Sequence, residues 1–286
     1  MFQTKNNSKT VREDHWKTAD GSDLVLLRFP MLEKTGIVRH CFTTRLGGVS
    51  KGDCATMNLS FSRGDDPDCV FENFHRIACA LGVSEQEFVF TDQTHTKNVR
   101  LVTGADKGKG LTKERDFTDV DALVTGEPGI VLSAFFADCV PLYFVDPVHR
   151  AIGLGHSGWR GTVMRIGQSI IETMQKEFGT DPKDLVCAVG PSICRDCYEV
   201  GTDVAEAFCD SFAARRGEIL KPGKEDGKYM LDLWQANRIV LTEAGVKDER
   251  IAVTNLCTCC NGSVLFSHRA SNGRRGNMGA FLALAI

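Results

Sequence analysis

Residues 137–161 have the sequence ADCVPLYFVDPVHRAIGLGHSGWRG, in which a short polar segment separates two apolar ones. Val140–Val145 and Arg150–Gly155 have the composition of buried strands. Between them, Asp146 followed by Pro147 favours a type I turn. We therefore predict a β-hairpin in this central part of the chain.

Cys139 and His156 are the chemically informative residues of this hairpin. If Val145 faces Arg150, Cys139 faces His156 directly, and their Cβ atoms lie about 4.5–5.5 Å apart. That separation suits a thiolate and an imidazole that share one metal ion, and it also suits a Cys–His catalytic pair. Asp138 is the adjacent candidate for proton transfer, although an aspartate at a strand end also serves simply as a hydrogen-bond acceptor.

A glycine-rich turn follows the hairpin. The sequence GHSGWRG at 155–161 allows the backbone to approach a neighbouring group closely. Apolar residues from Val163 to Phe178 share one face and predict a long helix that ends at Gly179. A helix N-terminus favours anions and Arg160 adds positive charge, so Arg160 is a candidate substrate-binding residue.

The composition excludes several classes of protein. The chain has 286 residues, 42% of them apolar, which is enough for a sizeable core, and its formal charge of -3 provides no basic field for nucleic acid. The longest apolar run, Val131–Val145, is interrupted by Asp138 and Pro141 and is too short to span a bilayer. No signal-peptide pattern occurs in 1–16, so we expect a cytoplasmic protein with reduced cysteines.

The remaining pattern predicts a single mixed α/β domain over 21–286, with a loosely attached N-terminal segment over 1–20. Asp66 and Pro67 predict the start of a helix that ends at Gly82. Other strands are expected at Leu24–Phe29, Ile37–Thr43, Phe88–Thr91, Val99–Thr103 and Leu185–Val189, and other helices at Asp203–Phe212 and Leu231–Ala244.

Two Cys-x2-Cys pairs, Cys194 with Cys197 and Cys257 with Cys260, together contain the ligands of a four-cysteine zinc site. However, the 59 residues 198–256 separate the pairs, whereas zinc ribbons usually have about 15–20. The spacing therefore favours buried thiols at these positions.

Several motifs together resemble those of the YfiH/YlmD family, whose members are labelled laccase-domain or polyphenol oxidase proteins and, more recently, purine nucleoside phosphorylases. The motifs are TTRLGGVS (43–50), NL (58–59), QTH (93–95), ADCVPLYFVDP (137–147), GHSGWRG (155–161), CYEVG (197–201), DLWQANR (232–238) and the C-terminal CTCC and FSHR. The resemblance extends from about Ile37 to Phe281. It implies a compact α-β-β-α fold, distantly similar to that of the cytotoxic necrotizing factor deamidases.

The resemblance also implies a metal site and an activity. His95, Cys139 and His156 match the positions that hold one zinc ion in the family. The implied reactions are phosphorolysis of adenosine, inosine, guanosine and methylthioadenosine, and deamination of adenosine. The expected partners are therefore purine nucleosides and phosphate, with the chain acting as a monomer or weak homo-oligomer.

By motif position, Arg45 is expected to contact phosphate or substrate, and Asn58 and Gln93 are expected to hydrogen-bond to the substrate. The C-terminal motif departs from the family pattern, because Ala270 and Asn277 replace two arginines. These replacements weaken the case for an anion site in that segment.

Three other functions compete with a zinc nucleoside enzyme. The two histidines and one cysteine also suit a single copper ion, although a four-copper oxidase needs about ten histidines and the chain has seven. A metal-free Cys139–His156 hydrolase, or an enzyme that edits peptidoglycan precursors, is the second alternative. A metal-stabilised binding module without catalysis is the third.

Overall fold

Two six-stranded sheets lie face to face in the computed structural model, which describes residues 2–285. The strands are β1 (Arg12–Lys17), β2 (Asp23–Arg28), β3 (Val38–Thr43), β4 (Phe88–Phe90), β5 (Val99–Leu101), β6 (Ala122–Thr125), β7 (Val131–Phe136), β8 (Val140–Asp146), β9 (Ala151–Ser157), β10 (Val186–Val189), β11 (Glu199–Gly201), β12 (Leu220–Pro222), β13 (Lys228–Leu231), β14 (Ile251–Val253) and β15 (Met278–Leu284). The α-helices are α1 (Pro30–Glu33), α2 (Pro67–Leu81), α3 (Trp159–Val163), α4 (Ile166–Phe178), α5 (Thr202–Ser211), α6 (Arg216–Ile219) and α7 (Leu233–Glu243).

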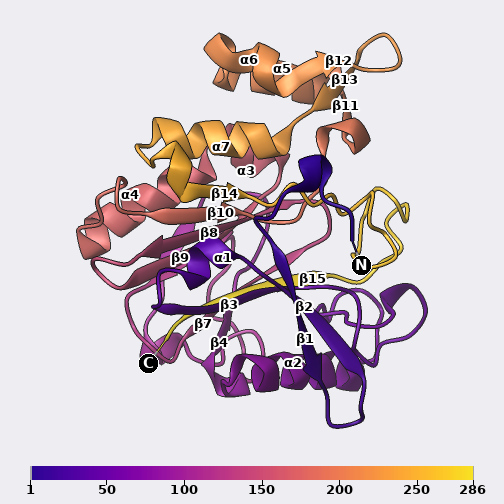
Figure 1. The fold of residues 1–286 in the computed structure, drawn as a ribbon, viewed down its shortest axis with the longest axis vertical. Coiled ribbons are helices and arrows are strands. Elements are labelled where there is room, and N and C mark those ends of the chain that lie inside the picture. Colours follow the sequence, from indigo (N-terminus) through magenta and orange to yellow (C-terminus); the bar gives the residue numbers. More distant parts are fainter. Residues whose placement is uncertain (1, 286) are drawn as a thin grey trace.

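The layers follow the order α-β-β-α. The first sheet has the strand order β1-β2-β3-β15-β7-β4 and the second has the order β14-β10-β8-β9-β6-β5. Helix α2 covers the outer face of the first sheet, whereas α4 and α7 cover the outer face of the second (Figure 1). The mixed α/β class and the layer order expected from the sequence are therefore confirmed.

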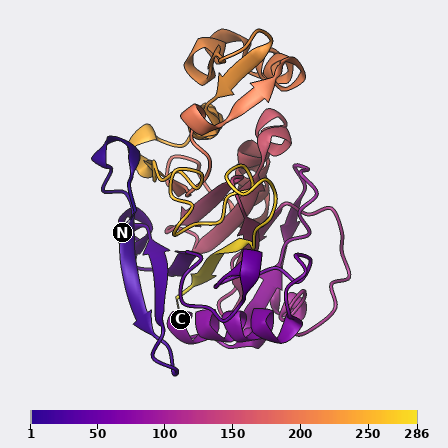
Figure 2. The same cartoon turned by 90° about the vertical axis from the view of Figure 1, so that its right-hand side faces the viewer.

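A small unit projects from the layered body. It contains a three-stranded sheet in the order β11-β13-β12 together with α5 and α6 (Figure 2). The expected helix at Asp203–Phe212 is α5. Because none of these strands has a strong apolar alternation, the small sheet was not predicted from the sequence.

Apolar side chains fill the space between the two large sheets. Phe42 and Leu132 from the first sheet meet Tyr143 and Leu154 from the second, and all four are fully buried. Burial of each such side chain contributes about 1.5–3 kcal/mol. Every residue of β8 and β9 is buried, because these strands are covered on both faces, and this explains their continuous apolar sequence.

Helix α2 forms as its sequence predicts. The Asp66 carboxylate accepts a hydrogen bond of 3.0 Å from the backbone N–H of Asp68, which caps the first turn. Gly82 ends the helix with a φ of 65°, a left-handed conformation that glycine adopts without strain. The buried face of α2 packs on the first sheet.

The predicted register of the β8–β9 hairpin is wrong by two residues. Pro141, not Cys139, is the cross-strand partner of His156, and Asp146 pairs with Ala151. The reason lies in the turn, which spans 147–150 instead of the predicted 146–149, because Asp146 belongs to β8 and its carboxylate accepts hydrogen bonds from the backbone N–H groups of Val148 and His149. Because the shift is even, the alternation of faces is unchanged, and Cys139 stays on the same side as His156.

Two other local predictions differ from the structure. The long helix predicted after Gly161 is divided into α3 and α4, because Arg165 adopts a φ of 61° between them. Within the segment expected to be loosely attached, β1 pairs along its whole length with β2. Among residues 2–285, no helix is long and apolar enough to cross a membrane.

A candidate metal centre beside a pocket

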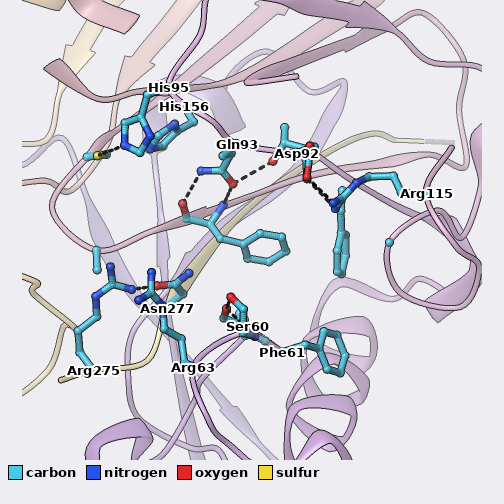
Figure 3. A pocket seen from close by; sticks show the side chains of 18 residues that line it. Ser60, Phe61, Arg63, Asp92, Gln93, His95, Arg115, His156, Arg275 and Asn277 are labelled. Carbon is cyan, nitrogen blue, oxygen red and sulfur yellow. Dashed lines mark hydrogen bonds and ion pairs between the residues drawn. The ribbon is translucent and has the colours of Figure 1, made fainter. Parts of the chain in front are cut away.

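His95, Cys139 and His156 come together at one end of the second sheet, and we call them the three-ligand site. Their nitrogen and sulfur ligand atoms all lie within 4.8 Å of one another, and the His95 Nε2 atom is 3.9 Å from the Cys139 Sγ atom. His95 lies in the loop between β4 and β5, Cys139 directly precedes β8, and His156 belongs to β9 (Figure 3). The ring centroids of His95 and His156 are 4.9 Å apart and the rings are nearly perpendicular.

Asp121 organises this site, and sequence analysis missed it. Its fully buried carboxylate accepts hydrogen bonds from the His156 Nδ1 atom at 2.7 Å and from the backbone N–H groups of Thr94, His95 and Thr96 at 3.1, 3.2 and 2.8 Å. It therefore orients one histidine directly and the other through its loop. The available signal was its position directly before β6, which is comparable to the position of Cys139 before β8.

The charges of the site are strongly coupled. Burial on its own would raise the pKa of the Cys139 thiol, but the positive charge of His156 and its hydrogen bond outweigh burial and lower the pKa to about 6. Burial would lower the pKa of His156, but the Cys139 thiolate and the Asp121 carboxylate raise it to about 9. Burial opposes ionisation of Asp121 as well, yet its hydrogen bond with His156 keeps the pKa of this carboxyl below its ordinary value.

The turn after β9 has no space for a side chain at Gly158. A Cβ atom at this position would lie 2.6 Å from the His95 Cδ2 atom and 3.2 Å from the Cys139 Sγ atom. The backbone of the turn therefore packs directly against two members of the three-ligand site. The close approach that the sequence predicted for the GHSGWRG segment is confirmed at this residue.

The donor set fits a metal ion. Two imidazoles and one thiolate are common zinc ligands, and three protein ligands with an open position are typical of a catalytic centre. A carboxylate that accepts from the second nitrogen of a metal-binding histidine, as Asp121 does for His156, is the usual supporting contact. The same donors also suit copper.

The open side of the three-ligand site faces a pocket of about 490 Å³, which is within the ordinary range for a small-molecule site. The residues that line it include Leu59, Ser60, Phe61, Ser62, Arg63, Phe90, Asp92, Gln93, Arg115, Phe135, Ala137, Arg275 and Asn277. Phenylalanine side chains and arginines therefore surround the same space. Such a lining suits a ligand that has both a flat apolar part and a negative charge.

Arg63 and Arg275 lie at one end of the pocket, beside Asn277 (Figure 3). Burial and, secondly, the charge of Arg63 lower the pKa of Arg275 to about 10. The Arg275 Nε atom is buried and has no hydrogen-bond partner among the described residues. Two neighbouring cations with an unsatisfied buried donor are favourable for binding an anion.

Gln93 lines the pocket, but its side-chain amide forms hydrogen bonds with the backbone of Phe135. Its amide donates to the Phe135 carbonyl oxygen at 2.7 Å and accepts from the Phe135 N–H at 2.7 Å. The side chain thus extends the edge of β7 and anchors the loop that carries His95. Gln93 therefore positions this loop, and its role as a substrate ligand stays a prediction.

Arg45 and Asn58 do not line the pocket. The Arg45 guanidinium donates to the backbone carbonyl oxygens of Ala55 and Gly262 at 2.9 and 3.0 Å. Asn58 is fully buried, and its amide oxygen accepts from the Asn277 N–H at 2.9 Å. Both residues therefore hold the pocket walls in place, and a contact of either residue with substrate stays a prediction.

Asp138 and Arg160 are not among the residues that line the pocket, and their predicted roles stay predictions. One Asp138 carboxylate oxygen accepts from the Thr258 hydroxyl at 2.6 Å and the other accepts from the Arg269 N–H at 2.7 Å, so Asp138 holds the C-terminal loop rather than facing the pocket. Arg160 is exposed, and its guanidinium stacks on the ring of Trp159 at 4.3 Å.

The model of a family described as multi-copper polyphenol oxidoreductase laccase matches residues 39–285. The chain belongs to this family. It is 35% identical over 244 residues to purine nucleoside phosphorylase YlmD of Bacillus subtilis, an overlap that covers 85% of this chain and 87% of that protein. It is 36% identical over 232 residues to adenosine deaminase RL5 of an unknown prokaryotic organism, which covers 80% of this chain and 88% of that protein.

A solved structure agrees with these relatives. The crystal structure of YfiH from Bacillus licheniformis matches with a TM-score of 0.86 at 32% identity, over 91% of this chain and 96% of that one. The resemblance to the YfiH/YlmD family is therefore confirmed, and the names of its relatives identify nucleoside-processing enzymes within this laccase-like family.

The histidine content does not support the multi-copper part of the family description for one chain. The chain has seven histidines, whereas a four-copper centre needs about ten. Among the histidines within residues 2–285, only His95 and His156 belong to a group of side chains placed to hold a metal ion.

Proposed function

We propose that the chain is a zinc-dependent purine nucleoside phosphorylase that also deaminates adenosine. The observation that carries this proposal is the shape of one pocket, which has the three-ligand site at one side and Arg63 with Arg275 at another. The relatives named as a purine nucleoside phosphorylase and an adenosine deaminase support it.

His95, Cys139 and His156 would hold the zinc ion. When bound, zinc supplies positive charge that stabilises an anionic oxygen of the reactants. The chain itself keeps His156 in one orientation through Asp121, and the backbone of Gly158 packs against the His95 ring.

In phosphorolysis, a phosphate oxygen forms a bond to C1′ of the ribose while the bond from C1′ to the purine nitrogen breaks. The electron pair of that bond leaves with the purine, which then takes up a proton. Arg63 and Arg275 would bind the phosphate and fix its attacking oxygen, because charge-assisted hydrogen bonds from guanidinium groups orient oxyanions. Phe61 and Phe135 offer apolar surfaces for the purine ring.

In deamination, water adds at C6 of adenine and ammonia leaves. This reaction takes place on the same bound nucleoside and needs no phosphate. The two reactions therefore place different demands on the arginines, because only phosphorolysis uses an anionic second substrate. This difference allows them to be separated experimentally.

Product chromatography of adenosine tests the proposal. Wild-type protein loaded with zinc is expected to form adenine only when phosphate is present, and inosine also without phosphate. Arg275→Gln should raise the KM for phosphate by about 10- to 100-fold, since a hydrogen bond to a charged group is worth about 1.5–3 kcal/mol. The matched control is Arg160→Gln, which changes an exposed arginine outside the pocket. Absence of both adenine and inosine would contradict the proposal.

A Cys–His hydrolase is the second candidate, and the proximity of Cys139 to His95 and His156 favours it. Thiol alkylation distinguishes the two. Cys139 should be protected in the zinc-loaded protein and become reactive after chelation, whereas a free nucleophile reacts from the start. Copper in place of zinc in the purified protein, together with faster oxidation of phenols than turnover of nucleosides, would favour the oxidase instead.

A further inference from the structure

The two Cys-x2-Cys pairs that lie far apart in the sequence meet in the structure. The Sγ atoms of Cys194, Cys197, Cys257 and Cys260 all lie within 4.8 Å of one another, and we call these residues the four-cysteine cluster. The cluster is separate from the three-ligand site and has no part in the reaction proposed above.

The sheet topology explains why 59 intervening residues do not keep the pairs apart. Strands β10 and β14 are parallel neighbours, so their carboxyl ends meet at the same edge of the second sheet. One cysteine pair follows β10 and the other follows β14. The pairing continues beyond the strands as a parallel bridge between Ser192 and Cys257. The intervening residues form the projecting unit, α7 and β14, and the pairing of β14 with β10 returns the chain to the first cysteine pair.

The spacing of the sulfurs suits a tetrahedral metal ion. Zinc–sulfur bonds of about 2.3 Å place the sulfurs of a tetrahedron about 3.8 Å apart. The Sγ atoms of Cys197 and Cys260 are 3.5 Å apart, which is close to this value and far from the length of about 2.05 Å of a disulfide. Cys194 and Cys257 are buried, whereas Cys260 is exposed at the rim.

Backbone donors point at the cluster. The N–H of Cys194 donates to the Cys257 Sγ atom at 3.3 Å, and the N–H of Cys260 donates to the same sulfur at 3.4 Å. Such bonds stabilise a thiolate, which is the form that binds a metal ion. We propose that Cys194, Cys197, Cys257 and Cys260 together bind a second, structural zinc ion.

The position of the cluster indicates what this zinc holds in place. It joins the entrance of the projecting unit to the loop 254–277. Within that loop Thr258 and Arg269 bind Asp138, and the Arg269 guanidinium donates to the Cys197 carbonyl oxygen at 3.1 Å. The same loop carries Arg275 to the pocket. A closed four-cysteine site would therefore fix one wall of the pocket without contacting a reactant.

Metal analysis in a His156→Ala background tests the proposal independently of catalysis, because this variant removes a ligand of the three-ligand site. The His156→Ala protein is expected to retain about one zinc ion per chain. Adding Cys260→Ser should remove most of that zinc, whereas adding Cys79→Ser should not. Cys79 is the matched control, since it is an exposed thiol on α2, away from the cluster.

Alkylation of the unmodified wild-type chain provides a test that does not depend on a variant folding. Cys260 and Cys79 are both exposed, so without a metal ion they should react with iodoacetamide at similar rates. With zinc bound, Cys260 should react at least about tenfold more slowly and reach the rate of Cys79 after chelation. Equal rates before chelation, protection that a reductant removes, or iron in place of zinc would overturn the proposal.

Discussion

The three-ligand site and the four-cysteine cluster lie in the same chain but are built for different tasks. The first combines two imidazoles with one thiolate, opens on a pocket and is oriented by a buried carboxylate. The second contains four sulfurs that surround one point and are supported by backbone N–H groups. An incomplete ligand set beside a pocket is typical of catalytic zinc, and a complete one is typical of structural zinc.

The largest effect is expected for His156→Ala, which changes the three-ligand site and leaves the four-cysteine cluster intact. His156→Ala should lower nucleoside turnover by about 1000-fold, since a catalytic metal ion contributes several kcal/mol of transition-state stabilisation. The same variant should retain a cooperative thermal unfolding transition, because the layered core is unchanged. Turnover and calorimetry on one preparation provide the measurement. Turnover within tenfold of wild type would assign the reaction to another part of the molecule.

Asp121→Asn tests whether the buried carboxylate is needed to orient the three-ligand site. The amide cannot replace a carboxylate that accepts from both a histidine and the backbone, so metal affinity or turnover should fall by about 10- to 100-fold. Competition with a chromophoric chelator measures the affinity. Asp138→Asn is a useful contrast, because Asp138 holds a loop and does not bind a ligand residue. Equal losses in both variants would argue against a specific role for Asp121.

Gly158→Ala should weaken zinc binding by about tenfold, or about 1.4 kcal/mol, because the new methyl group would displace the His95 ring. Gly217→Ala is the control, since a Cβ atom there meets nothing within 4 Å. Zinc titration of both variants gives the comparison. Unchanged affinity in Gly158→Ala would show that the loop carrying His95 can move without loss.

His40 shows what burial does to a histidine without a neighbouring thiolate or carboxylate. It lies between the sheets, accepts a hydrogen bond of 2.9 Å from the Phe29 N–H, and burial followed by the charge of Arg28 lowers its pKa to about 3. Between pH 3 and the unfolded value of about 6.5, the unfolded chain binds the additional proton. The contribution of neutral His40 to the stability of the folded protein is therefore complete above about pH 6.5 and is lost as the pH falls toward 3.

Denaturant titrations over this range measure the effect. The His40 contribution to the free energy of unfolding should fall by about 1.4 kcal/mol per pH unit below pH 6.5. His40→Gln keeps an acceptor but does not titrate, so its stability should depend less steeply on pH. The same slope in both proteins would contradict a neutral, buried His40.

Features that depend on neighbouring residues were predictable. The α2 boundaries follow from Asp66, Pro67 and Gly82, because caps act over two or three residues. The β8–β9 hairpin follows from two apolar segments around a turn. Its register was not predictable, because the two hydrogen bonds that the Asp146 carboxylate accepts from Val148 and His149 select a turn shifted by one residue, which the pattern alone does not distinguish.

The candidate site also combines features that could be predicted from the sequence with features that could not. The family motifs placed His95, Cys139 and His156 together, and the structure brings their ligand atoms within 4.8 Å. The residues proposed as substrate ligands mostly bind the protein itself, because short polar motifs do not show whether a side chain faces a cavity or a backbone group. Arg63 and Arg275 were missed, since a single arginine in a loop has no distinguishing local pattern.

Local sequence thus specified most of the strands and helices of the two large layers, the caps of α2, and the residue types able to hold a metal ion. Only the tertiary structure determined which distant segments meet: the parallel β10–β14 pair unites the four cysteines, and Asp121 joins the His95 loop to β9. The physical reason is that side-chain chemistry and turn preference act over a few residues. The contacts of a buried carboxylate or thiol depend instead on the packing of the whole sheet.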